Sequence, residues 1–149
     1  MSPDPARLFV WRLQISRPAI ILLDIDLMGM NSNDAHKREG VMPTYKKYLG
    51  FGALQMTWEG FIIDSVLRSG DKHSNHGHGT ERMIRRVVHL IRSRYRKDVP
   101  IVFHFDSGYM DQKLFEAMES WDVDYVCGGK LYPDIIDGVR QTPQEAWGG

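Results

Sequence analysis

The sequence has a single cysteine, no long apolar run and no excess of charge of either sign. Cys127 alone cannot form an internal disulfide, and one thiol fits a reducing compartment. No apolar stretch is long enough to span a membrane, and the N-terminal residues lack the apolar core of a signal peptide. Basic and acidic residues number 19 each, so no global field favours nucleic acid or a membrane surface. We therefore expect a cytoplasmic protein in which only a local patch meets a polyanion.

The 149 residues are enough for one folded domain with its own core. An aromatic content of 11%, with four tryptophans, excludes a disordered chain. Residues 1–18 contain three prolines and no sustained hydrophobic period, so we interpret them as a lead-in segment. Residues 19–132 are predicted to form the domain. Residues 133–149 form a tail, punctuated by proline and glycine, whose structure the pattern does not assign.

The stretch from Ala19 to Met30, AIILLDIDLMGM, predicts a central strand buried on both faces. Burying acidic residues at its end is costly unless a cation or a substrate is their partner. Because side chains alternate along a strand, Asp24 and Asp26 are expected to point the same way, roughly 6–7 Å apart. This geometry suits a metal site. The alternative is a strand end that frays into an acidic loop.

Regular elements are also predicted beyond this strand. Residues 52–67 predict a hairpin with a two-residue turn at Glu59 and Gly60. A helix is predicted from about Thr80, with one apolar stripe and one basic face. The stripe consists of Ile84, Val87, Val88, Ile91 and Tyr95, and the basic face of Arg82, Arg85, Arg86, His89, Arg92 and Arg96.

A second buried strand is predicted at residues 101–105, IVFHF, and it also ends in an acid, Asp106. A short helix at 111–121 and a strand at 124–127 follow. Three strands in a meander, followed by strands linked through helices, are typical of the ribonuclease H-like α/β fold with a mixed sheet. In that fold the fourth strand lies beside the first, a placement that right-handed crossovers favour. Asp106 would then join Asp24 and Asp26.

Clustered carboxylates at a sheet edge suit Mg²⁺ or Mn²⁺, which prefer oxygen ligands. Two such ions, about 3.5–4 Å apart, can clamp the attacking and leaving oxygens of a phosphoryl transfer. Two aspartate positions rarely suffice for both ions, so a third acid is expected. Glu116, Glu119 and Glu145 are poor candidates for that role.

Four stretches carry a resemblance to a known family: LLDID, KREGVMPTYKKYLGFGALQMTW, LRSGDKHSNHG and FDSGYMDQKLFEAMESWDVDYVCGGKLY. Together they resemble the catalytic core of bacterial insertion-sequence transposases of the DDE type, over about residues 19–137. The DSGY after a buried strand is the most specific mark. In this family the first catalytic aspartate falls on Asp24 or Asp26, with Asp26 favoured because it lies nearer the strand end. The second falls on Asp106.

The resemblance implies a ribonuclease H-like core that carries out DNA transposition by metal-dependent strand cleavage and strand transfer. It implies Mg²⁺ or Mn²⁺ as cofactor, bound by the three aspartates. The partners it implies are DNA, as transposon ends and target, and no membrane. It also allows a homo-oligomer and implies a location at the bacterial nucleoid.

The sequence departs from the family pattern in two respects. The third acid of such transposases, a glutamate, follows an inserted segment beyond the fifth strand, and the sequence stops at Gly149 before it. The usual N-terminal DNA-binding region is missing as well. We therefore expect an incomplete core, and one alternative is a non-catalytic remnant that at most binds DNA. A less favoured alternative is a haloacid-dehalogenase-like phosphatase that uses Asp24 and Asp26.

Several smaller features have a functional and a structural interpretation. Contacts to DNA phosphates are predicted for Lys46, Lys47, Arg85, Arg92 and Lys130, and solvated surface is the alternative for each. His104 shares a strand face with Asp106 and so could approach the site, but a packed histidine is the favoured interpretation. Cys127, on an apolar strand, is predicted to be a buried thiol.

Overall fold

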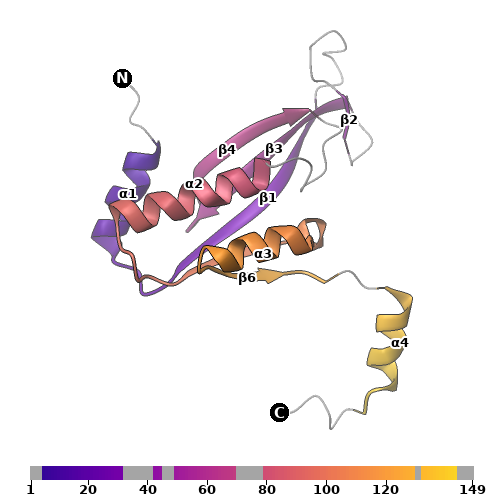
Figure 1. The fold of residues 1–149 in the computed structure, drawn as a ribbon. Helices are drawn as coiled ribbons and strands as arrows, with labels where there is room; N and C mark the ends of the chain where they lie inside the picture. Colours follow the sequence, from indigo (N-terminus) through magenta and orange to yellow (C-terminus); the bar gives the residue numbers. More distant parts are fainter. Residues whose placement is uncertain (1–4, 32–41, 45–48, 70–78, 130–131, 144–149) are drawn as a thin grey trace.

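The computed structural model describes residues 5–31, 42–44, 49–69, 79–129 and 132–143, and the statements below apply to them. A six-stranded mixed sheet carries helices on one face (Figure 1). The elements in chain order are α1 (Pro5–Ser16), β1 (Ile21–Asn31), β2 (Met42–Pro43), β3 (Leu49–Trp58), β4 (Phe61–Ser69), α2 (Gly79–Arg94), β5 (Ile101–Phe105), η1 (Ser107–Tyr109), α3 (Gln112–Ser120), β6 (Asp124–Cys127) and α4 (Pro133–Gln141).

Strand β1 lies at the centre of the sheet, between antiparallel β3 and parallel β5. β4 pairs with β3 after a turn in which Glu59 and Gly60 both adopt positive φ, 49° and 79°. Two positive φ values are characteristic of the hairpin turns that match the twist of the flanking strands. β6 extends the sheet as a parallel neighbour of β5, and β2 pairs with the start of β3. The predicted hairpin, the meander and the position of the fourth predicted strand beside the first are confirmed.

Burial alternates along β1, which corrects the expectation of a strand buried on both faces. Ile21, Leu23, Ile25 and Leu27 are buried, whereas Leu22, Asp24, Asp26 and Met28 are exposed. The buried side faces the core formed with α1, α2 and α3, and no element in the described ranges covers the other side. We call this other side the open face. The apolar run concealed the alternation because Leu22 and Met28 are apolar and yet about half exposed.

The first 18 residues contain regular structure that the sequence pattern did not predict. Helix α1 spans Pro5–Ser16 and buries Phe9 and Leu13 in the core. The Phe9 ring meets Trp58 of β3 edge-on, with 5.5 Å between ring centroids. A proline lies near each end of this helix. Pro5 is the first residue, where a backbone N–H would have no partner within the helix, and Pro18 follows the last turn. The apolar period of α1 is too weak to predict a helix, so the two prolines were the available signal for it.

The predicted apolar stripe of α2 is confirmed. Ile84, Val87, Val88 and Ile91 are buried against the sheet, while the arginines lie on the outward side. Helix α3 covers the same face and contributes Leu114 and Met118 to the same core. The fold therefore has one layer of sheet and one layer of helices, with the second surface of the sheet open.

The tail contains helix α4, which stands apart from the sheet (Figure 1). Of the helices in the described part of the chain, none combines the length and the apolar character needed to cross a lipid bilayer.

Candidate active site on the open face beside β1 and β5

Parallel pairing of β1 and β5 brings two acidic residues side by side. Ile25 pairs with Phe105 in the last matched step between β1 and β5. Asp26 and Asp106 come directly after Ile25 and Phe105, so the two acids lie side by side at the same level of the sheet. Both are exposed, and both fall on the open face because side chains alternate along each strand. The predicted adjacency of the two strands is confirmed, but β1 continues to Asn31, so Asp26 lies within the strand and not at its end as expected.

Local contacts hold Asp106 in a defined turn. Its Oδ1 accepts a hydrogen bond from the Gly108 amide at 2.8 Å, which caps the short helix η1. Tyr109, at the end of η1, is completely buried and its ring stacks on Phe105, with 5.6 Å between centroids. The DSGY stretch thus places an aspartate at the surface and anchors it with a buried aromatic ring.

The end of β6 supports this turn from the side. The Cys127 thiol donates to the Asp106 carbonyl at 3.3 Å, and the Gly128 amide donates to the Phe105 carbonyl at 3.1 Å. Cys127 is partly rather than fully buried, which corrects the prediction. Burial raises the pKa of its thiol, and the Asp106 charge raises it further. The thiol is therefore held in its neutral form.

Asp24 contacts His104, a relationship that the sequence analysis did not predict. The two residues are paired across β1 and β5, and Asp24 Oδ1 lies 2.8 Å from His104 Nδ1. Both side chains are about half exposed, at 53% and 56%. The prediction of a core histidine was wrong because His104 falls on the open face. The signal available in the sequence was that both residues lie two positions before an acid.

A group of three carboxylates, as expected for Asp24, Asp26 and Asp106, is not found. Within the described ranges no three His, Cys, Asp or Glu side chains gather in a way that could hold a metal ion. Asp24 is engaged with His104, whereas among the described residues Asp26 Oδ1 accepts only from the neighbouring Leu27 amide, at 2.8 Å.

Asp26 and Asp106 nevertheless fit one hard divalent ion. Each uses Oδ1 for a backbone amide, and in the described structure each Oδ2 is without a protein partner. A Mg²⁺ ion commonly takes one or two carboxylates and completes its shell with water and phosphate oxygens. Two exposed carboxylates at one level match that pattern.

The candidate third acids do not join this pair. Glu116 accepts from Gln112, and Glu119 accepts from the Tyr125 hydroxyl at 2.9 Å. Both lie on α3, which covers the face of the sheet opposite Asp26 and Asp106. Glu145 lies outside the described residues.

The residues predicted to contact DNA are placed only in part. Arg85 is exposed on α2. Arg92 donates to the Val99 carbonyl and, at 3.1 Å, to the Asp122 carbonyl, so its guanidinium ties the end of α2 to two loops. Lys46, Lys47 and Lys130 lie outside the described residues.

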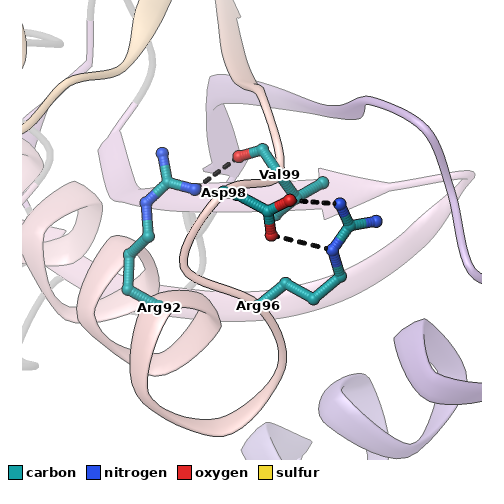
Figure 2. Close-up of polar contacts among 4 residues, drawn as sticks. All are labelled: Arg92, Arg96, Asp98 and Val99. Carbon is teal, nitrogen blue, oxygen red and sulfur yellow. Dashed lines mark hydrogen bonds and ion pairs between the residues drawn. The ribbon is translucent and has the colours of Figure 1, made fainter.

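Figure 2 shows Arg92 beside a second anchor of the same loop, the bidentate pair of Arg96 and Asp98. The two hydrogen bonds measure 3.0 and 2.7 Å. The hydrogen bond from Arg96 lowers the pKa of Asp98 below its ordinary value. Arg92, in the last turn of α2, and Arg96, just after it, are therefore engaged within the protein.

Solved structures with a similar fold are transposase catalytic domains. The catalytic domain of Mos1 mariner transposase matches with a TM-score of 0.52 and 11% identity, over 97% of this chain and 74% of that one. PiggyBac transposase, in a synaptic complex with hairpin DNA, matches with a TM-score of 0.52 and 16% identity, over 89% of this chain and 30% of that one. At these identities the likeness establishes the fold, and the ribonuclease H-like class is confirmed. No curated protein matches the chain by sequence.

The family model of the transposase DDE domain, group 1, matches residues 9–148. This match covers nearly the whole chain and decides against the haloacid-dehalogenase hypothesis. The predicted resemblance to DDE transposases is confirmed, and with it the association with DNA recombination. The chain belongs to the family of transposase DDE domains, whose function is DNA transposition.

Proposed function

We propose that this chain carries out metal-dependent cleavage and transfer of DNA strands, with Asp26 and Asp106 as the residues that hold a divalent ion. The observation that carries the proposal is the register of β1 and β5, which places these two carboxylates at one level on the open face. The same register favours Asp26 over Asp24 as the first catalytic acid, because Asp24 lies two residues earlier in β1, opposite His104, and contacts it.

The solved neighbours support the choice of ion and partner. Structures of the Mos1 catalytic domain with raltegravir include one with Mg and one with Mn, each with a TM-score of 0.51 to this chain. The piggyBac structure is a complex with DNA. We extend both properties to this chain, with Mg²⁺ or Mn²⁺ as cofactor and DNA as substrate. As a separate part of the proposal, the chain assembles as a homo-oligomer.

Each residue of the site has a defined task in this proposal. A divalent ion held here would supply Lewis-acid activation of a phosphoryl oxygen and of the attacking oxygen. Asp26 and Asp106 are the residues that would hold it, while the amides of Leu27 and Gly108 orient the two carboxylates. Tyr109 keeps the Asp106 turn in place from the core side. The open face leaves room for a nucleic acid strand to approach.

The test is nicking of supercoiled plasmid DNA in Mn²⁺ by the wild-type chain and by Asp26→Asn, Asp106→Asn and Asp24→Asn variants. We expect the first two variants to lose nicking by at least about a hundredfold, because metal activation contributes several kcal/mol. Asp24→Asn should retain it. Electron paramagnetic resonance of Mn²⁺ gives a second readout, in which Asp26→Asn and Asp106→Asn lose ion binding.

Two outcomes would contradict the proposal. Loss of nicking and ion binding in Asp24→Asn but not in Asp26→Asn would reverse the assignment of the first acid. A wild-type chain that binds DNA but neither nicks it nor binds Mn²⁺ would favour the non-catalytic alternative.

A further inference from the structure

The outward face of α2 carries a row of cations that the catalytic proposal does not use. Arg82, Arg85, Arg86 and His89 recur at intervals of three and four residues, so they share one side of the helix. All four are exposed, and together they line a shallow hollow of about 350 Å³. From Arg82 to His89 these residues span about 10 Å of helix at 1.5 Å per residue. We call the four residues Arg82, Arg85, Arg86 and His89 the basic tract.

Part of this charge is compensated and part is not. Arg86 forms an ion pair with Asp64 of β4, a residue that is mostly shielded from solvent. Arg82 and Arg85 have no ion pair with any acid in the ranges that the structure describes. Glu81 precedes them in the first turn of the helix. The uncompensated charge is therefore concentrated at Arg82 and Arg85, which lie on the solvent side of the helix.

The basic tract and the aspartates lie on opposite sides of the molecule. Helix α2 lies on the face of the sheet that carries the helices (Figure 1), and its apolar stripe is buried there. Arg82 and Arg85 are exposed on the opposite side of the helix. Asp26 and Asp106 lie on the open face. A duplex seated on the basic tract is thus a different segment of DNA from the strand at the two carboxylates.

We propose that the basic tract binds the phosphate backbone of a second DNA segment, independently of sequence and of divalent metal. The protein has no net charge, so this concentration of cations is local rather than a reflection of composition. Guanidinium groups donate in a fork that matches phosphate oxygens, and such contacts position DNA without reading bases. The choice of DNA among polyanions rests on the proposed function.

The test is fluorescence anisotropy of labelled duplexes of two unrelated sequences, in EDTA, between 50 and 200 mM salt. The variant is Arg82→Glu/Arg85→Glu. The control is Lys113→Glu/Arg140→Glu, which makes the same change in net charge at exposed positions of α3 and α4. Equal thermal midpoints for the three proteins establish that all are folded.

We expect the α2 variant to bind both duplexes at least about tenfold more weakly at low salt, because two phosphate contacts are lost. The slope of log affinity against log salt should become shallower by about 2. The control should bind within about twofold of the wild type, since only its net charge changes.

Equal affinity of the wild type and the α2 variant would overturn the inference, and so would an equal loss in variant and control. A loss confined to one of the two sequences would overturn the claim of sequence independence. Because EDTA removes the metal, this binding assay is separate from the nicking assay. Failure of nicking with intact tract-dependent binding refutes only the proposed catalysis, and the reverse result refutes only this inference.

Discussion

Asp24 and His104 occupy paired positions on the parallel strands β1 and β5, and Asp24 Oδ1 lies 2.8 Å from His104 Nδ1. The residues are 80 positions apart in sequence and meet on the open face of the sheet. This contact distinguishes the environments of the two aspartates in the LLDID stretch. In the part of the chain that the structure describes, Asp24 has a side-chain hydrogen-bond partner, whereas Asp26 accepts a hydrogen bond only from a backbone amide.

The first prediction concerns the strength of this contact. Because both side chains are about half exposed, a double-mutant cycle of Asp24→Asn and His104→Gln should give a coupling of less than about 1 kcal/mol. Urea unfolding of the four proteins measures it. A coupling well above 2 kcal/mol would show that the pair is a structural anchor instead.

The second prediction concerns Gly128, which lies against the Asp106 turn. A Cβ at this position would come within 3.3 Å of the Ser107 amide nitrogen, so Gly128→Ala must displace backbone next to Asp106. We expect a loss of about 1 kcal/mol in the free energy of unfolding, a value typical of overpacking, together with weaker Mn²⁺ binding. Urea unfolding and Mn²⁺ titration provide the two measurements.

Gly129→Ala is the matched control, because a Cβ there has no described atom within 4 Å. It should change neither quantity appreciably. If the two alanine variants behave alike, the contact between Gly128 and the Asp106 turn does not matter.

The third prediction follows from the raised pKa of Cys127, which burial and then the Asp106 charge produce. Above the ordinary thiol pKa the unfolded chain loses this proton while the folded chain keeps it. The thiol therefore stabilises the fold below that pH, and the contribution is lost as the pH rises through the folded-state pKa. Urea unfolding at pH 7.5 and 9.5 should show this decline in the wild type.

Cys127→Ser removes the thiol and should lack this part of the decline. Asp106→Asn should lower the pKa of the Cys127 thiol only part of the way toward its ordinary value, because burial is the larger cause of the shift. The rate of alkylation by iodoacetamide as a function of pH reports this shift. A Cys127 that reacts like a free thiol near neutral pH would contradict the assignment.

The fourth prediction tests whether α1 belongs to the core. Leu13 is completely buried, so Leu13→Ala should reduce the free energy of unfolding by about 2–5 kcal/mol. Ile15→Ala, on the same helix but 62% exposed, should change it by less than about 0.5 kcal/mol. Equal, small effects of the two changes would mean that α1 detaches without consequence for the sheet.

Local patterns of the sequence were sufficient for most of the elements. The hairpin around Glu59 and Gly60, the buried stripe of α2 and the strand at 101–105 all lie where their periods predicted them. A period of two or 3.6 residues is encoded by neighbouring side chains, so it is visible without the fold. The weak apolar period of α1 explains why that helix was missed.

The sequence by itself determined that an acid follows each of two apolar strand segments, at Asp26 and Asp106, and that the DSGY stretch follows the second strand. Only the tertiary structure decided that Asp26 of β1 and Asp106, directly after β5, lie side by side, that Asp24 contacts His104, and that one face of the sheet is open. These features depend on the register between β1 and β5 and on which face the helices cover. Hydrogen bonds between strands and the packing of α1, α2 and α3 determine both, and these contacts join residues far apart in the chain.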